Sequence, residues 1–219
     1  KFDTLPNTIK LLGNELGHVI KQQAGTKYYK IVEEIRLNSK NYRATKNEKY
    51  LNEIFKLLKN LKPEEIYVIT KSFTIFFYLS NIAEQVFREH FLEIKKIKIK
   101  SSDKTSLTFS PVFTAHPTES SRQSTLKKRY KIGEIIEKNN SKDMAEINSL
   151  IAQLWYTRDT RSSKPNPLDE VKSLIFYLDI LYRNVYNDLI SDQDISNGSS
   201  NFNISFGSWV GADKDGNPY

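Results

Sequence analysis

Only two short stretches of this chain alternate apolar and polar side chains in the manner of a β-strand. They lie far apart in the 219-residue sequence, at 107–114 and 202–209. Two strands make a stable sheet only when they pair with each other or with strands from elsewhere. Because the rest of the chain has mainly helical periodicity, the sequence predicts a mostly helical protein with a small strand component.

The helical stretches are recognised by apolar residues that recur every three or four positions. Pro63 ends the third of them, and Glu64 and Glu65 supply acidic residues to the first turn of the fourth. The fourth is apolar on more than one face, which predicts a helix buried centrally in a bundle. The stretches are 9–20, 27–35, 50–61, 64–87, 126–135, 144–155 and 168–189.

The two strand-like stretches differ in what interrupts and follows them. Pro111 lies inside the first and removes one donor from the ladder, which favours a shorter strand over 112–114. The second leads directly into the turn-like segment GADKDGNPY, where the sequence ends. A chain that stops in such a turn leads us to expect a truncated domain.

Composition narrows the classes of function. The chain has no cysteine, which excludes disulfides, thiolate metal sites and a cysteine nucleophile. The uncharged and largely apolar stretch Ser72–Ala83 is shorter than a membrane span, and the first residues do not resemble a signal peptide, so we expect a cytoplasmic protein without membrane contact. The net charge of +7 permits nucleic-acid binding, but the lysines are scattered among glutamates, so we expect no nucleic-acid partner.

His116 is the first candidate functional residue. It stands in the string FTAHPTE, where a strand end turns directly into an expected helix beginning near Pro117. The free amides of a helix N-terminus bind anions, and imidazole changes its protonation near neutral pH. His18 and His90 fall within regular amphipathic helices and are interpreted as ordinary helix residues. The residues alone leave catalysis and a structural cap at His116 equally open.

The second candidate is the segment SWVGADKDGNP, which follows the second strand-like stretch. Its glycines let backbone approach a ligand closely, with Trp209 as an apolar wall and Asp213 and Lys214 as polar contacts. The alternative is a plain tight turn. A calcium loop is disfavoured, because an EF-hand requires a regular ligand series ending in glutamate.

The two candidates share one arrangement, a strand followed by an abrupt turn with small and charged residues. In a barrel of parallel strands and helices, active sites gather at the C-terminal ends of the strands. We therefore expect both segments to face the same mouth. The predicted organisation is an N-terminal helical region over residues 1–100, followed over 101–219 by the first strands of an incomplete barrel of this kind.

Three strings, in this order, resemble phosphoenolpyruvate carboxylases: FTAHPTESSRQS, LWYTRDTRSSKPNPLDE and SWVGADKDGNP. The opening segments LLGNELGHVI and NIAEQVF are similar to the family's N-terminal helical region, so the resemblance covers essentially the whole chain. Members are several times longer, mostly helical, usually tetrameric and built around an eight-stranded barrel, so the resemblance implies that residues 101–219 hold the first strands of an incomplete (β/α)8-type barrel. The resemblance implies carboxylation of phosphoenolpyruvate by bicarbonate to oxaloacetate and phosphate, an anaplerotic supply to the tricarboxylic acid cycle that uses Mg²⁺ or Mn²⁺.

The resemblance also implies roles for individual residues. His116 matches the histidine that takes the proton from carboxyphosphate, and Trp209 matches a tryptophan that lines the phosphoenolpyruvate pocket. Arg122 and Arg161 fall where plant-type members bind a sugar-phosphate activator. The family's metal-binding carboxylates and phosphate-binding arginines lie beyond Tyr219, so the chain alone is expected to be inactive and to hold no metal.

Two departures from the family pattern limit this comparison. Gln123 stands where members often have a second arginine, which puts half of the activator site in doubt. Lys214 replaces an arginine, and lysine keeps the charge but loses the planar fork. A different class of function also stays open, namely a helical anion-binding or regulatory module that retains the N-terminal region of the family but has no catalytic activity.

Overall fold

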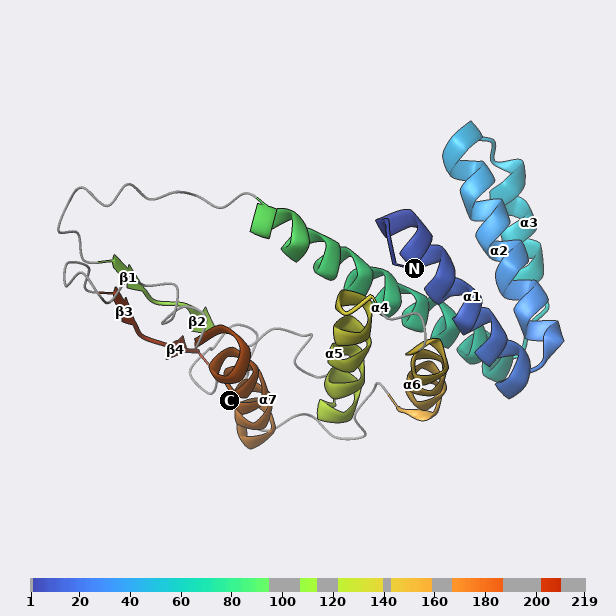
Figure 1. Cartoon of the computed structure of the whole chain (residues 1–219). Coiled ribbons are helices and arrows are strands. Elements are labelled where there is room, and N and C mark those ends of the chain that lie inside the picture. Colours follow the sequence, from blue (N-terminus) through green and yellow to red (C-terminus); the bar gives the residue numbers. More distant parts are fainter. Residues whose placement is uncertain are drawn as a thin grey trace. The chain divides into compact units, whose positions relative to one another are not determined.

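The computed structural model describes residues 2–94, 107–113, 122–139, 143–158, 167–186 and 202–209. Its contacts divide the chain into two compact units (Figure 1). The first comprises Lys1–Lys96 and Lys127–Thr157, and the second comprises Ile97–Leu126 and Arg158–Tyr219. Residues 127–157 thus return to the first unit. The predicted two-domain division near residue 100 stays a prediction.

The first unit is entirely helical in its described residues. The helices are α1 (Leu5–Gln23), α2 (Thr26–Thr45), α3 (Lys49–Lys59), α4 (Pro63–Ile94), most of α5 (Gln123–Glu137), and α6 (Met144–Tyr156). Each coincides with a stretch predicted from apolar periodicity. The prediction of a mostly helical protein is therefore confirmed for the part of the chain that is described.

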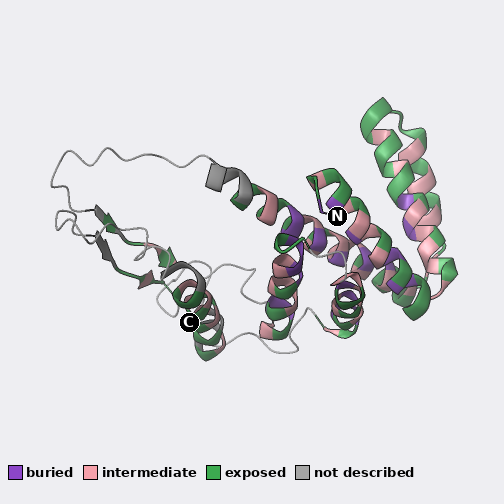
Figure 2. Ribbon diagram, in the orientation of Figure 1, coloured by how far each residue is buried: buried purple, intermediate pink, exposed green. Residues whose placement is uncertain are grey.

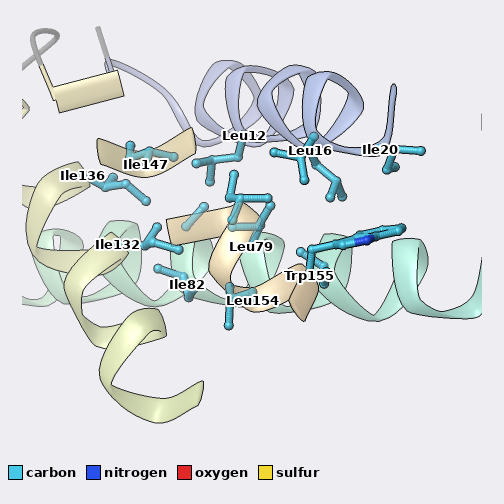
Figure 3. Packing of buried hydrophobic residues seen from close by; sticks show 14 of the residues in the cluster. Leu12, Leu16, Ile20, Leu79, Ile82, Ile132, Ile136, Ile147, Leu154 and Trp155 are labelled. Carbon is cyan, nitrogen blue, oxygen red and sulfur yellow. The ribbon is translucent and has the colours of Figure 1, made fainter. Parts of the chain in front are cut away.

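The core of the first unit lies between α1, α4, α5 and α6. Figure 3 shows Leu12 and Leu16 of α1 facing Leu79 of α4, with side chains from α5 and α6 completing the cluster. Figure 2 shows the buried residues on the faces of these helices that point toward one another. The remaining labelled members of the cluster are Ile20, Ile82, Ile132, Ile136, Ile147, Leu154 and Trp155.

Two glycines shape the connection and the packing between α1 and α2. Gly25 has φ of 102°, a backbone conformation that side-chain-bearing residues rarely adopt. Gly17 is buried against Tyr29, and a Cβ added to it would lie 2.9 Å from Cε2 of that ring. The absence of a side chain at residue 17 therefore lets α2 pack closely on α1.

The long helix α4 was predicted to be central, and it contributes Ile69, Ile75, Leu79, Ile82 and Ala83 to the core. Its segment Pro63–Glu89 is also long and apolar enough to cross a membrane by length and composition, which the count of uncharged residues alone did not show. In the structure 39% of its most apolar 18-residue stretch is buried. The buried residues place α4 as the core helix of the first unit.

Two lysines secure the end of α6. Lys71 Nζ of α4 donates a hydrogen bond to the carbonyl oxygen of Thr157 at 3.0 Å, and Lys128 Nζ of α5 donates to its hydroxyl oxygen at 3.3 Å. Cations are stabilising where the last carbonyl groups of a helix carry partial negative charge. The two contacts therefore tie α4 and α5 to the point where α6 ends.

The second unit contains one long helix and four short strands among its described residues. Helix α7 (Pro167–Ile180) continues as a π-helix, η3 (Leu181–Tyr186). The strands are β1 (Leu107–Phe109), β2 (Val112–Phe113), β3 (Phe202–Ile204) and β4 (Gly207–Ser208). β1 pairs with β3, and β2 pairs with β4, both in parallel. The expectation of further barrel strands stays a prediction.

The apolar stripe of α7 is only partly covered by the described part of the chain. Leu168 is 69% exposed and Ile175 is 57% exposed, whereas Leu178 and Leu181 are half-buried. The sequence led us to expect this stripe to pack against an apolar surface, and at Leu168 and Ile175 the described residues do not provide one. An exposed helix stripe of this kind is suited to contact with additional protein.

Candidate functional site

The two strand pairs of the second unit form one parallel ribbon with a break in its middle. Leu107 is opposite Phe202 before the break, and Val112 is opposite Gly207 after it. The separation in sequence between partners is the same on both sides, so the register passes through the break without a slip. We call residues 107–113 with 202–209 the parallel ribbon.

The break in the parallel ribbon lies at Pro111, as its chemistry requires. Proline has no backbone N–H, so the regular ladder stops there. The sequence favoured a strand only beyond Pro111, over 112–114. This was too restrictive, because residues on both sides of Pro111 pair with the 202–208 segment.

Three hydrogen bonds hold the parallel ribbon together at the break and beyond it. The hydroxyl groups of Ser110 and Ser205 lie 2.7 Å apart. The Gly207 N–H donates to the carbonyl oxygen of Pro111 at 3.0 Å, and the Trp209 N–H donates to that of Phe113 at 2.8 Å. Trp209 is thus tied through its backbone to the last residue of β2.

Parallel pairing decides where the two sequence motifs leave the ribbon. Because β2 and β4 are parallel, their C-terminal ends lie at the same edge. Phe113 is followed after two residues by His116, and Ser208 is followed directly by Trp209 and then by the segment containing Asp213 and Lys214. Both motifs therefore begin from adjacent strand ends at one edge of the ribbon.

The same edge carries exposed apolar surface. The rings of Phe113 and Phe206 are 6.2 Å apart between centroids. Trp209 is 53% exposed and Phe206 is 48% exposed. Aromatic side chains left open at the ends of parallel strands can form one wall of a ligand pocket.

Comparison with known proteins decides the family. The model of the family described as phosphoenolpyruvate carboxylase matches residues 5–110 and 94–219. The chain belongs to the phosphoenolpyruvate carboxylase family. The resemblance inferred from the three sequence strings is thereby confirmed.

Curated relatives extend this result. Phosphoenolpyruvate carboxylases of Haemophilus influenzae, Serratia proteamaculans and Roseiflexus castenholzii are 30%, 28% and 27% identical to the chain over 256, 254 and 257 aligned positions. The alignments cover 99–100% of this chain. The chain spans only 27–29% of the length of these phosphoenolpyruvate carboxylases.

Of the residues singled out from the sequence, Trp209 and Arg122 lie in the described part of the chain. Trp209 is at the end of the parallel ribbon. Arg122 immediately precedes α5, and its carbonyl oxygen accepts hydrogen bonds from the N–H groups of Thr125 and Leu126 at 2.9 and 3.1 Å. The other four, His116, Arg161, Asp213 and Lys214, lie outside the described residues, so their assignments stay predictions.

Gln123 has a structural contact that the sequence did not reveal. It was noted only as a departure from the arginine common in phosphoenolpyruvate carboxylases. Its side-chain Nε2 donates a hydrogen bond to the carbonyl oxygen of Lys172 at 2.7 Å, which links the start of α5 to α7 within the second unit. The contact uses one of the two N–H groups of this neutral amide, which carries no charge to attract an anion.

The described residues do not provide a metal site. Within that part of the chain no group of three or more histidine, aspartate or glutamate side chains could hold a metal ion. The donor set that Mg²⁺ or Mn²⁺ requires, several oxygen ligands, is therefore not assembled by the described residues. The predicted location of the metal ligands beyond Tyr219 stays a prediction.

The charged groups with shifted pKa lie in the first unit and concern its stability. Glu65 accepts hydrogen bonds from Lys27 Nζ at 2.5 Å and from the Lys62 N–H at 2.9 Å. The hydrogen bond from Lys27 lowers the pKa of the Glu65 carboxyl below its ordinary value, and the same contact raises the pKa of Lys27. This cluster joins the starts of α2 and α4.

Proposed function

We propose that this chain supplies the histidine-bearing part of a phosphoenolpyruvate carboxylase active site, in an enzyme that is a carboxy-lyase. The observation that carries the proposal is the parallel pairing of β2 with β4, whose ends lead to His116 and to Trp209. Family membership supports the same reaction, since the curated relatives are named phosphoenolpyruvate carboxylase. The substrates are phosphoenolpyruvate and bicarbonate.

The proposed reaction has two stages. A bicarbonate oxygen bonds to the phosphorus of phosphoenolpyruvate while the bond from phosphorus to the enolate oxygen breaks, giving carboxyphosphate and an enolate. His116 then takes the carboxyl proton of carboxyphosphate, and CO₂ and phosphate separate. The enolate carbon bonds to CO₂ to form oxaloacetate, and the proton leaves His116 to the phosphate. A histidine suits this role because its pKa lies near the working pH of such an enzyme.

The remaining residues have positioning roles in this proposal. Trp209 forms an apolar wall that keeps water away from the enolate, and Asp213 and Lys214 make polar contacts to substrate. Arg122 and Arg161 bind an anionic activator. The described residues do not fit a divalent metal, so no step is assigned to Mg²⁺ or Mn²⁺. We further propose a cytoplasmic homotetramer for the complete protein, without nucleic-acid or membrane partners.

The first test is substitution of His116 by asparagine in the complete product of the gene that encodes this chain. Oxaloacetate is measured by coupling to malate dehydrogenase, and phosphate is measured separately. We expect His116→Asn to abolish oxaloacetate while bicarbonate-dependent phosphate release continues, because carboxyphosphate still forms but is not deprotonated. The matched control is His18→Asn, which replaces an exposed histidine of α1 and should leave both products unchanged.

Two results would contradict the proposal. Unchanged oxaloacetate output from His116→Asn would remove the role assigned to that histidine. If the complete product binds phosphoenolpyruvate but forms no oxaloacetate, the regulatory-module alternative is correct. The isolated 219 residues are expected to form no oxaloacetate, since the chain spans less than a third of the length of its relatives.

A further inference from the structure

We infer that Ser110 and Ser205 are positioning residues, which set the register between the strand leading to His116 and the strand leading to Trp209. The register between the two strands follows from their contacts alone. Its effect on catalysis rests on the proposed function. We call the contact between the two hydroxyl groups, 2.7 Å apart, the serine bridge. It lies at the break of the parallel ribbon, between the two regularly paired segments.

The break is the point at which the register is least constrained by the backbone. Pro111 cannot donate a hydrogen bond, so the ladder loses one of its contacts there. The serine bridge and the hydrogen bond from the Gly207 N–H to the Pro111 carbonyl oxygen cross this region. A serine side chain is short, so its hydroxyl reaches only the residue directly opposite. The serine bridge is therefore specific for one register.

Gly207 supports the same register from the other side of the break. It lies opposite Val112, and a Cβ built on it would be 3.2 Å from Val112 Cγ2, which is tighter than ordinary van der Waals contact. A slip of one residue would place Phe206 or Ser208, each with a side chain, opposite Val112. The fit of Val112 against a residue without a side chain thus disfavours neighbouring registers.

Register matters here because the two candidate motifs begin within a few residues of the paired strands. A slip of one position shifts one strand end along the other by about 3.3 Å and turns its side chains to the opposite face. Misplacement of a catalytic group by about 1 Å can reduce a rate by about 100-fold. By holding one register, the serine bridge and the fit of Val112 against Gly207 would therefore keep the start of the His116 motif aligned with Trp209.

The register can be tested in the 219-residue chain without any assay of activity. The chain contains no cysteine, so an engineered pair has no competing thiol. We expect Ser110→Cys with Ser205→Cys to form an intramolecular disulfide under mild oxidation, detected by mass spectrometry of peptides. The matched control is Thr108→Cys with Ser205→Cys, which moves one thiol by two residues on the same strand face and should stay mostly reduced. Equal oxidation of both pairs would overturn the register.

The positioning role is tested in the complete gene product by the ratio of oxaloacetate to phosphate. We expect Ser205→Ala to lower this ratio by about 10-fold, because misalignment lets carboxyphosphate form but separates the proton acceptor from it. Ser205→Thr retains the hydroxyl and should restore most of the ratio. If both products fall in proportion, or if the threonine variant behaves as the alanine variant does, the role is only structural and the inference fails.

The two experiments separate failure of the inference from failure of the proposed function. If the wild-type product makes no oxaloacetate but the Ser110 and Ser205 pair is oxidised selectively, the register stands and the proposed function falls. If oxaloacetate is made and the cysteine pairs do not discriminate, the proposed function stands and the positioning role of the serine bridge falls.

Discussion

At the scale of single residues, we expect alanine to change the free energy of unfolding in opposite directions at Gly13 and at Gly17 of α1. A Cβ at Gly13 would meet Phe76 at 3.6 Å, an ordinary contact, whereas one at Gly17 would lie 2.9 Å from the Tyr29 ring. We expect Gly13→Ala to raise the free energy of unfolding by about 0.5–1 kcal/mol through helix propensity. Gly17→Ala should be less stable than Gly13→Ala by about 1–3 kcal/mol through overpacking, as measured by urea unfolding. Equal stability of the two variants would show that Tyr29 moves without cost.

At the scale of elements, Glu65 links the starts of α2 and α4, which predicts a specific pH dependence. Its folded pKa lies below the ordinary 4.5, so its stabilisation is present above that pH and is lost as pH falls through the folded value. Lys27, whose pKa is raised above 10.5, loses its contribution as pH rises beyond that value. We expect Glu65→Gln to reduce the loss of thermal stability that occurs as pH falls below 4.5, measured by thermal unfolding across this pH range. Glu64→Gln, in the same first turn, should retain it.

At the scale of the whole molecule, the exposed stripe of α7 predicts association of the 219-residue chain with itself. Leu168 and Ile175 are 69% and 57% exposed, and exposed apolar side chains on one helix favour association between copies. We expect Leu168→Glu with Ile175→Glu to raise the concentration at which light scattering begins. The control is Lys172→Glu, at an exposed residue of the same helix, which alters charge without removing apolar surface. If it raises the concentration for light scattering equally, the apolar stripe is not the cause of association.

Helix positions could be predicted closely because their signal is local. Pro63 with Glu64 and Glu65 marks the start of α4, and each described helix follows an apolar stripe that can be read within a dozen residues. The contribution of Gln123 could not be predicted, because its acceptor on Lys172 is 49 residues away in the sequence. The candidate site was predicted as two motifs that share a mouth. The parallel strands β2 and β4 end where the two motifs begin, and the shared mouth itself stays a prediction.

The sequence by itself determined the type of each described element, the two strand-bearing stretches and the family, since all three depend on residue patterns within short segments. Only the tertiary structure decided that the two stretches pair with each other, in parallel and in one register across Pro111. It also decided that the stripe of α1 is buried while Leu168 and Ile175 of α7 are exposed. Pairing and burial depend on residues far apart in the chain, which local periodicity does not specify.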